Sequence, residues 1–251
     1  MDYGTEEEFR LIAPGYDDDY PALAPDDPMI TFMRGHLDQG DRIVEFGIGT
    51  GRVAIPLAQS GLRVSGIDLS EEMLKVLGRK PEALGIETVH GSFLEQRVSG
   101  TFAAVVCVFN TLYHVHDQQG QELALRKAAE HIPENGLIFL ENTSALHLMS
   151  HYQATDRLGV FRIEPSFTWL LAGRVSQLKQ ELKISHIKLR ADGSSVTPVT
   201  LRYIWPSELH LMARQAGLEV VAEHGDWDGR PFDTTSKSHI VILRKRASLP
   251  S

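Results

Sequence analysis

The chain has 251 residues with 42% hydrophobic content, enough for one sizeable core, and one cysteine, Cys107, which cannot form an internal disulfide. Its formal net charge is −8 and its one basic block is RKR at 244–246, so a nucleic-acid partner, which needs a basic surface, is disfavoured. With no apolar run of about 18 residues and no apolar leader at its acidic start, the sequence predicts no membrane partner and a cytoplasmic protein.

The predicted elements begin after an N-terminal stretch, residues 1–28, that is rich in Asp, Pro and Tyr. We expect this stretch to form an arm or lid rather than a separate domain. Residues 29–145 then alternate strand and helix patterns, which implies parallel strands with helices on both faces of one sheet. In such sheets ligands bind beyond the carboxyl ends of the strands. The expected strands are 42–47, 62–68, 86–91, 102–110 and 136–143, and the expected helices are 53–60, 71–80 and 118–132.

The pattern changes after residue 145. Between about 160 and 205 polar and apolar residues alternate with a period near two, and Asp192–Gly193 is a turn signal. We expect residues 146–205 to form a helix and an inserted antiparallel β-hairpin, which either roofs the substrate crevice or makes a homodimer contact. Residues 206–251 add a helix that begins at Pro206 and two strands that complete the core.

A glycine-rich turn follows the first predicted strand, in the stretch 43-IVEFGIGTGR-52. Gly47, Gly49 and Gly51 stand at alternate positions, and Glu45 precedes them. Glycine loses the most backbone freedom on folding, so this density indicates that something approaches the turn closely. The dinucleotide fingerprint G-x-G-x-x-G would need a glycine at position 52, where the chain has Arg52, so a nicotinamide cofactor is disfavoured.

The acid, the three glycines and Asp68 at the end of the next strand resemble the class I S-adenosylmethionine-dependent methyltransferases. The resemblance covers about residues 40–145 well and the rest of the chain more loosely. It implies an α/β fold, a Rossmann-like seven-stranded, mostly parallel sheet with a reversed last strand, to which this chain adds the inserted β-hairpin. It implies S-adenosyl-L-methionine as cofactor, with Gly47, Gly49 and Gly51 against it, Asp68 on the ribose hydroxyls and Glu45 near the amino group. For Gly51, tight helix–strand packing is the alternative.

Other cofactor contacts implied by the resemblance are less specific. Many relatives carry an acid after the third strand to hold the adenine, whereas this chain has Ser92, which can hydrogen-bond, and Phe93, which can pack on the ring. Leu69 and Met73 are expected as an apolar wall to the adenine, with helix packing as the alternative for Met73. Arg52 is expected to pair with the cofactor carboxylate or with the acid of the turn, or else to be a solvated helix residue.

The arm contains 14-PGYDDDYP-21, whose aromatic residues Tyr16 and Tyr20 resemble those that close over the methionine end of the cofactor in small-molecule relatives. Aromatic faces attract a cationic sulfonium. A disordered acidic arm is the alternative, and Phe9 and Tyr3 are further candidates.

The end of the fourth strand, 108-VFNTLYHVHD-117, is expected to pass the sulfonium and open toward the substrate. Phe109 and Asn110 would lie nearest the cofactor, with strand-end packing and turn chemistry as alternatives. Tyr113 and His114 are expected on the substrate side. Histidine is the side chain best suited to act as a base at neutral pH, which makes His114 the catalytic candidate. No further ligands complete a metal set with His114 and His116, so no metal is predicted.

Two tryptophans complete the predicted site. Trp169 precedes the expected hairpin and Trp227 lies in a late loop, and both are expected to contact the substrate, with core packing as the alternative. The sequence thus predicts an enzyme that transfers a methyl group to a hydroxyl or amine of a small molecule, a metabolite or a natural-product intermediate, similar to enzymes that methylate amino sugars. Two alternatives are a methyltransferase fold repurposed for another reaction, such as cyclisation, and a non-catalytic regulator that binds the cofactor.

Overall fold

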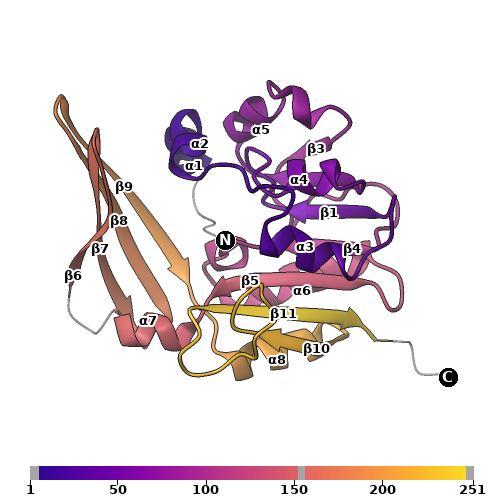
Figure 1. Ribbon diagram of the computed structural model, residues 1–251. Coiled ribbons are helices and arrows are strands. Elements are labelled where there is room, and N and C mark those ends of the chain that lie inside the picture. Colours follow the sequence, from indigo (N-terminus) through magenta and orange to yellow (C-terminus); the bar gives the residue numbers. More distant parts are fainter. Residues whose placement is uncertain (1–5, 152–155, 247–251) are drawn as a thin grey trace.

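The computed structural model describes residues 6–151 and 156–246, which form two separate β-sheets with helices around the larger one (Figure 1). The larger sheet has seven strands in the order β10-β11-β5-β4-β1-β2-β3. All neighbours in it are parallel except β11, which runs antiparallel to both β5 and β10. The predicted mostly parallel sheet with a reversed last strand is therefore confirmed. Its strands are β1 (Arg42–Phe46), β2 (Arg63–Asp68), β3 (Glu87–His90), β4 (Ala104–Cys107), β5 (Leu137–Thr143), β10 (Leu218–His224) and β11 (Ser238–Lys245).

Asp27, Ser70 and Asp117 are N-cap residues, and their side chains stabilise the start of the helices that follow them. Asp27, Ser70 and Asp117 each accept a backbone N–H from the first turn of the helix that follows, which satisfies a donor that has no partner inside the helix. The helices are α1 (Glu6–Ile12), α2 (Tyr16–Asp19), α3 (Pro28–Arg34), α4 (Ala54–Gln59), α5 (Glu71–Leu77), α6 (Gln118–His131), α7 (Ala145–His151) and α8 (Pro206–Gln215), with 3-10 turns η1 (Ala13–Gly15), η2 (Pro81–Ala83) and η3 (Thr111–His114). In the described part of the chain, no helix has the length and apolarity needed to span a bilayer.

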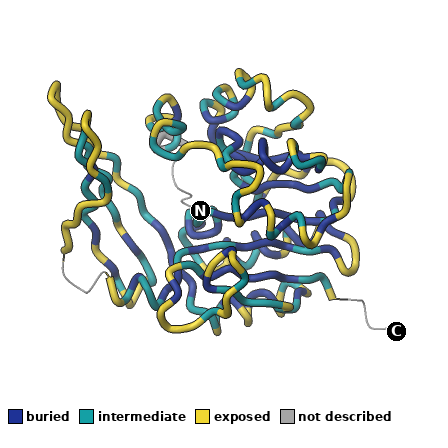
Figure 2. The backbone as a smooth tube through the Cα atoms, viewed as in Figure 1, coloured by how far each residue is buried: buried dark blue, intermediate teal, exposed yellow. Residues whose placement is uncertain are grey.

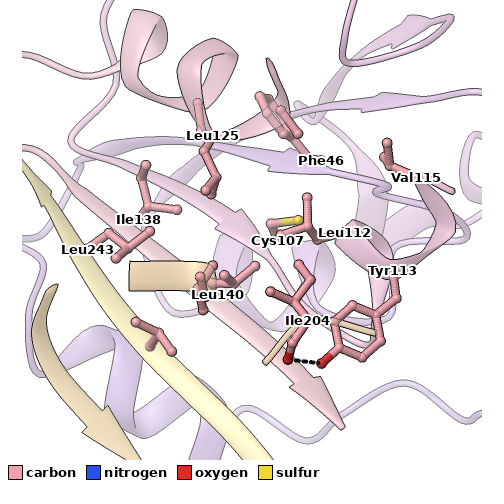
Figure 3. Close-up of a cluster of buried hydrophobic side chains, with 14 of the residues drawn as sticks. Phe46, Cys107, Leu112, Tyr113, Val115, Leu125, Ile138, Leu140, Ile204 and Leu243 are labelled. Carbon is pink, nitrogen blue, oxygen red and sulfur yellow. Dashed lines mark hydrogen bonds between the residues drawn. The ribbon is translucent and has the colours of Figure 1, made fainter. Parts of the chain in front are cut away.

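The central sheet separates two hydrophobic cores, because successive side chains of a strand point to opposite faces. On β4, Val105 and Cys107 pack into the core under α6 and α8, whereas Ala104 and Val106 pack into the core under α3 and α4. Figure 3 shows Cys107 in the first of these cores. Burial raises the pKa of its thiol to about 12, so Cys107 is a small apolar residue rather than a reactive one.

The second sheet is an antiparallel wing of four strands in the order β6-β7-β8-β9 (Figure 1). The predicted hairpin is the β8–β9 pair, and its turn is Ala191–Asp192, one residue before the predicted Asp192–Gly193, because Gly193 already pairs with Arg190. The sequence prediction missed the β6–β7 pair, because its turn, Pro165–Ser166, lacks the glycine or asparagine that marks most tight hairpins. The strands are β6 (Arg157–Glu164), β7 (Phe167–Ser176), β8 (Glu181–Arg190) and β9 (Gly193–Arg202).

The N-terminal helices stand between the two sheets (Figure 1). α1 contacts both α5 of the core and β9 of the wing. Figure 2 shows that the outer parts of the wing are exposed, whereas the inner strands of the larger sheet, such as β1 and β4, are buried. The division of the chain at residues 28, 145 and 205 stays our prediction.

Candidate active site

The glycine turn after β1 has a backbone conformation that residues with a side chain rarely adopt. Gly47 and Gly49 have φ values of 72° and 55°, in the left-handed region that favours glycine. A Cβ on Gly47 would come within 2.8 Å of Thr111 Cγ2. Both glycines line a cavity at the carboxyl ends of β1, β2 and β4, hereafter the inner cavity.

Gly51 lies outside the wall of the inner cavity. Its φ is 85°, and a Cβ there would come within 2.4 Å of Leu77 Cδ1 on α5. The third glycine therefore allows α5 to pack closely against the start of α4. Tight helix packing, the alternative weighed from the sequence, replaces the predicted cofactor contact of Gly51.

Asp68 is fixed at the end of β2 by two backbone donors. Its Oδ2 accepts the N–H of Gly49 at 2.7 Å, and its Oδ1 accepts the N–H of Ser70 at 2.8 Å. Burial raises the pKa of this carboxyl, and the two N–H groups oppose that shift. Each carboxylate oxygen has two lone pairs, so Asp68 retains acceptor capacity for hydroxyl groups in the inner cavity.

Glu45 presents a buried acid without a partner. Its side chain is 4% exposed, it lines the inner cavity, and its Oε2 has no hydrogen-bond partner among the described residues. Burial raises the pKa of Glu45 well above its usual value, and the neighbouring Asp68 adds to the shift. Buried polar atoms are almost always paired, so Glu45 fits a ligand that brings an ammonium group.

The rest of the inner cavity combines an aromatic ring, apolar side chains and the hydroxyl-bearing residues Ser92, Thr50 and Thr111. Phe93 stacks on Phe46 of the core at 5.0 Å between ring centroids, which fixes its orientation. Met73 is buried by helix packing and also lines the cavity, so its predicted contact with the adenine stays a prediction. Four predicted residues form this part of the wall: Leu69, Met73, Ser92 and Phe93. The sequence prediction missed Ile48, Thr50, Val53, Val108, Thr111 and Val115, which also line it and carry no distinctive signal.

The chain turns sharply where β4 ends. Phe109 and Asn110 have φ values of 54° and 64°, a left-handed conformation that is uncommon for residues other than glycine. The N–H of Phe109 donates to Glu141 Oε2 at 2.8 Å, and the N–H of Thr143 donates to Asn110 Oδ1 at 2.6 Å. These bonds to the end of β5 hold a strained turn at the edge of the inner cavity. The sequence prediction missed Glu141, although an acid near the carboxyl end of an apolar strand was a usable signal.

A second cavity of about 710 Å³, hereafter the outer cavity, lies between the central sheet, the N-terminal helices and the inner face of the wing. Its wall includes Tyr20, Asn110, Tyr113 and Trp169 from the predicted site. Five residues line both cavities and so form the boundary between them: Phe9, Tyr16, Arg52, Phe109 and His114. A group transferred from a ligand in one cavity to a ligand in the other must pass this boundary.

His114 is the titratable side chain with the strongest shift at the boundary. It is half-buried and packs on Phe9, at 5.0 Å between ring centroids, and its Nδ1 is buried without a hydrogen-bond partner in the described part of the chain. Burial lowers the pKa of His114 to about 4, with a further contribution from His116. The imidazole is therefore neutral at pH 7, and it can accept a hydrogen bond but is a weak base.

The arm is attached to both sheets. Asp17 forms an ion pair with Lys80 at 2.7 Å and accepts the hydroxyl of Thr50 at 2.6 Å, whereas Asp19 accepts from Lys188 of the wing. These contacts place Tyr16 over the boundary and Tyr20 at 5.6 Å from Trp169. The described arm is therefore helical, which contradicts the alternative of a disordered arm; Tyr3 lies outside the described residues.

Trp227 lies away from its predicted contact, whereas Arg52 lines both cavities but does not pair with Glu45, so its pairing with the cofactor carboxylate stays a prediction. The guanidinium of Arg52 stacks on Phe109 at 4.0 Å and donates to the carbonyl of Pro21, rather than to Glu45. Trp227 is 8% exposed, packs against Phe32 of α3 at 5.6 Å and lines neither cavity. Its predicted substrate contact is replaced by core packing, because the late loop folds over α3. No cluster of three metal-ligating side chains occurs within residues 6–151 and 156–246.

Comparisons with known proteins agree with this architecture. The family described as Methyltransferase domain matches residues 43–136. The solved structure of the CcbJ methyltransferase from Streptomyces caelestis has a TM-score of 0.87 and 31% identity, covering 97% of this chain and 100% of that one. The cypemycin N-terminal methyltransferase of a Streptomyces species is 28% identical over 89% of this chain and 91% of its own length. A dTDP-3-amino-3,6-dideoxy-alpha-D-glucopyranose N,N-dimethyltransferase of Streptomyces fradiae is 29% identical over 56% of this chain and 54% of its own length.

The chain belongs to the S-adenosylmethionine-dependent methyltransferases. It is an enzyme of that family, and S-adenosylmethionine is its cofactor. The inner cavity fits this cofactor on two independent observations, the unpartnered carboxyl of Glu45 and the bare backbone at Gly47 and Gly49.

Proposed function

We propose that this enzyme methylates an amine of a small natural-product intermediate, with the cofactor in the inner cavity and the substrate in the outer cavity. The names of two relatives specify methylation at nitrogen, in a peptide N-terminus and in an amino sugar. The observation that carries the choice of an amine over a hydroxyl is His114. An imidazole whose pKa is about 4 is a poor base for a hydroxyl, whereas a neutral amine already has a free electron pair.

Bound S-adenosylmethionine supplies a methyl group on a positively charged sulfur, which a neutral amine takes by direct displacement, leaving a neutral thioether. In our proposal Glu45 holds the amino group of the cofactor and Asp68 holds its ribose hydroxyls. Gly47 and Gly49 allow the backbone to approach, and Leu69, Met73, Ser92 and Phe93 enclose the adenine. Such positioning of the two reactants supplies much of the rate in a reaction of this kind.

The boundary residues act on the reacting groups. The rings of Tyr16 and Phe109 face the junction of the cavities, and aromatic faces stabilise a nearby cation. His114 accepts an N–H of the amine and so turns the nitrogen electron pair toward the methyl group. An amine that arrives protonated must lose its proton to water before transfer, because His114 is too weak a base to take it, and the N-methylammonium product keeps its own proton near neutral pH.

The proposal is tested by release of S-adenosylhomocysteine from the purified enzyme with matched pairs of small amines and alcohols. We expect turnover with amines and none with the alcohols of the same skeleton. Turnover of alcohols alone would contradict the amine proposal. Consumption of substrate with intact cofactor would indicate a repurposed fold instead, an alternative that the named relatives do not support.

The homodimer and the cytoplasmic location stay predictions. Val160, Ile163 and Val196 are exposed apolar side chains on the wing, and strand register places Val160 and Val196 in one row of the face opposite Trp169. We expect a second copy to pack there. Light scattering on the wild type and on Ile163→Glu would test this, since only a dimer through this face would lose mass in the variant.

A further inference from the structure

The inner face of the wing carries a row of hydrogen-bond donors that the methyl transfer does not use. In the strand register Trp169 on β7 lies beside Lys188 on β8, which lies beside Ser195 on β9. The next row on the same face joins His186 and Thr197. All five line the outer cavity.

Trp169 holds a buried hydrogen-bond donor that no described residue satisfies. Its side chain is 1% exposed, and its Nε1 has no partner among the residues that the structure describes. A buried donor without an acceptor destabilises the folded protein. The ring is held by Phe161 at 4.9 Å and Tyr20 at 5.6 Å, so the indole is fixed in place. A ligand that accepts from Nε1–H would remove this cost.

Lys188 adds positive charge beside that donor. Its side chain is 13% exposed, its Nζ lies 4.4 Å from the Trp169 ring centroid, and it forms an ion pair with Asp19 of the arm. Arg190 lines the same part of the cavity. Arg162 also lies near this donor, 5.6 Å from the Trp169 ring centroid, so the cations here outnumber the one carboxylate, Asp19, that pairs with Lys188, which suits an anion.

His186 completes the donor set without adding charge. Its ring lies 5.4 Å from that of Trp169, and burial lowers its pKa to about 4, with a further contribution from Lys188. A neutral imidazole retains one N–H donor. The rest of the wing face is apolar, through Leu171, Leu182, Ile184, Val199 and Leu201. The outer cavity thus has a reactive end at His114, an apolar wall and a donor-rich, positively charged part on the wing.

We propose that Trp169 and Lys188 form a subsite for a carboxylate carried by the amine substrate. The carboxylate accepts the indole N–H and shares the ammonium of Lys188 with Asp19, while the amine lies at the boundary with the inner cavity. The substrate is then an amino acid in the broad sense, with apolar atoms between its amine and its acid. This inference rests on the proposed function for the position of the amine.

The test is a titration followed by the indole N–H signals of the ¹⁵N-labelled enzyme saturated with S-adenosylhomocysteine. The chain has three tryptophans, and loss of one signal in Trp169→Phe assigns Trp169. The probes are a series of ω-amino acids from aminobutyrate to aminooctanoate, with the amino alcohols and alkylamines of the same lengths. We expect the Trp169 signal to move with an amino acid at a concentration about tenfold below that needed for its alkylamine, while the buried Trp227 signal stays in place. A Trp169 signal that never moves, or that moves equally with the alkylamine, would overturn the subsite.

Two charge variants separate recognition from general damage. Lys188→Met removes the cation and should weaken binding of the amino acid about tenfold, with little change for the amino alcohol. Asp19→Asn frees Lys188 from its partner and should tighten binding of the amino acid instead. Weaker binding of every probe in both variants would mean that the pair is merely structural, and would overturn the proposal.

The titration needs no turnover, so the subsite and the proposed function fail separately. If no amine is methylated but the Trp169 signal reports the carboxylate, the proposed function is wrong and the subsite stands. If amines are methylated and the Trp169 indole N–H signal does not move, the subsite is wrong and the proposed function stands.

Discussion

The carboxylate of Asp68 accepts the backbone N–H of Gly49 at 2.7 Å, so the acid that ends β2 also fixes the glycine turn that ends β1. Asp68 and Gly49 are nineteen positions apart in the chain, so this bond joins the acid and the glycine turn into one structural unit. Removing the acid should affect both a direct contact to the cofactor and the shape of the turn.

Asp68→Ala should abolish cofactor binding. Hydrogen bonds to charged groups contribute about 1.5 to 3 kcal/mol each, so losing the bonds to the ribose should weaken binding of S-adenosylhomocysteine at least about a hundredfold. Isothermal titration calorimetry measures the affinity, and circular dichroism checks that the fold is kept. Asp38→Ala, at an exposed position away from both cavities, is the matched control and should bind normally. Unchanged affinity in Asp68→Ala would contradict the proposed ribose contact.

Glu45 should make the stability of the ligand-free enzyme depend on pH. Its pKa is raised in the folded state by burial, so the folded state favours the protonated form. This contribution to the free energy of unfolding is present below the ordinary pKa of 4.5 and is lost as pH rises toward the raised value. Glu45→Gln cannot ionise, so its melting temperature relative to wild type should increase as the pH is raised above the ordinary pKa of 4.5.

Cofactor binding should reverse that preference, because an ammonium group favours the ionised form of Glu45. Binding of S-adenosylhomocysteine should therefore release protons from the wild type and not from Glu45→Gln. Calorimetry in buffers of different ionisation enthalpy measures the released protons. Equal proton release in the two proteins would show that Glu45 does not meet the cofactor ammonium.

Much of the fold could be predicted because buried parallel strands leave a strong signal. The run that contains β4 is apolar on both faces of the sheet, and Asp68 and the glycine turn each follow directly on a strand. Since carboxyl ends of parallel strands meet at one edge, Glu45, Gly47, Gly49 and Asp68 could be expected around one cavity, and they line one.

The failures have a common physical cause, since they depend on which segment far along the chain fills a space. Spacing alone cannot tell that Gly51 makes room for Leu77 rather than for a ligand. Trp227 enters the core only because its loop folds against Phe32. Glu141 on β5 accepts the N–H of Phe109, which follows β4, and no pattern within either segment predicts a hydrogen bond between them.

His114 should act as a neutral acceptor and not as a titrating base. Because its pKa is about 4, the pH profile of kcat should show no inflection from it between about pH 6 and pH 8. His114→Gln keeps an acceptor and should retain most activity, whereas His114→Phe should lower kcat/KM about 10- to 100-fold with the amine found in the screen. If His114→Gln removes an inflection near neutral pH that the wild type shows, the imidazole does titrate there and the proposed role is wrong.

Burial of His114 also has a consequence for stability. Its pKa is depressed in the folded state, so the stability it contributes is present above its ordinary pKa of 6.5 and is lost as pH falls toward about 4. The melting temperature of His114→Phe, relative to wild type, should therefore rise as pH falls through that window. A constant difference would mean that folding does not shift the pKa of His114.

Glu141 should position Phe109 rather than contact the cofactor. Its Oε2 accepts the N–H of Phe109, and its Oε1 accepts the hydroxyl of Ser238 at 3.2 Å. Left-handed residues such as Phe109 cost about 1 to 3 kcal/mol and persist only where neighbouring groups hold them. Glu141→Ala removes the acceptor, so we expect the turn to relax, the ring to leave the boundary and kcat to fall about tenfold or more, with a smaller change in affinity for S-adenosylhomocysteine.

Two variants distinguish this positioning role from a loss of packing. Glu141→Gln keeps an oxygen that can accept the Phe109 N–H, so it should restore most of kcat. Ser238→Ala removes only the bond to Oε1 and should leave kcat unchanged, although it lowers the melting temperature slightly. If Glu141→Gln is as slow as Glu141→Ala, the negative charge near the boundary matters rather than the hydrogen bond to Phe109, and Glu141 would then act on the reacting groups directly.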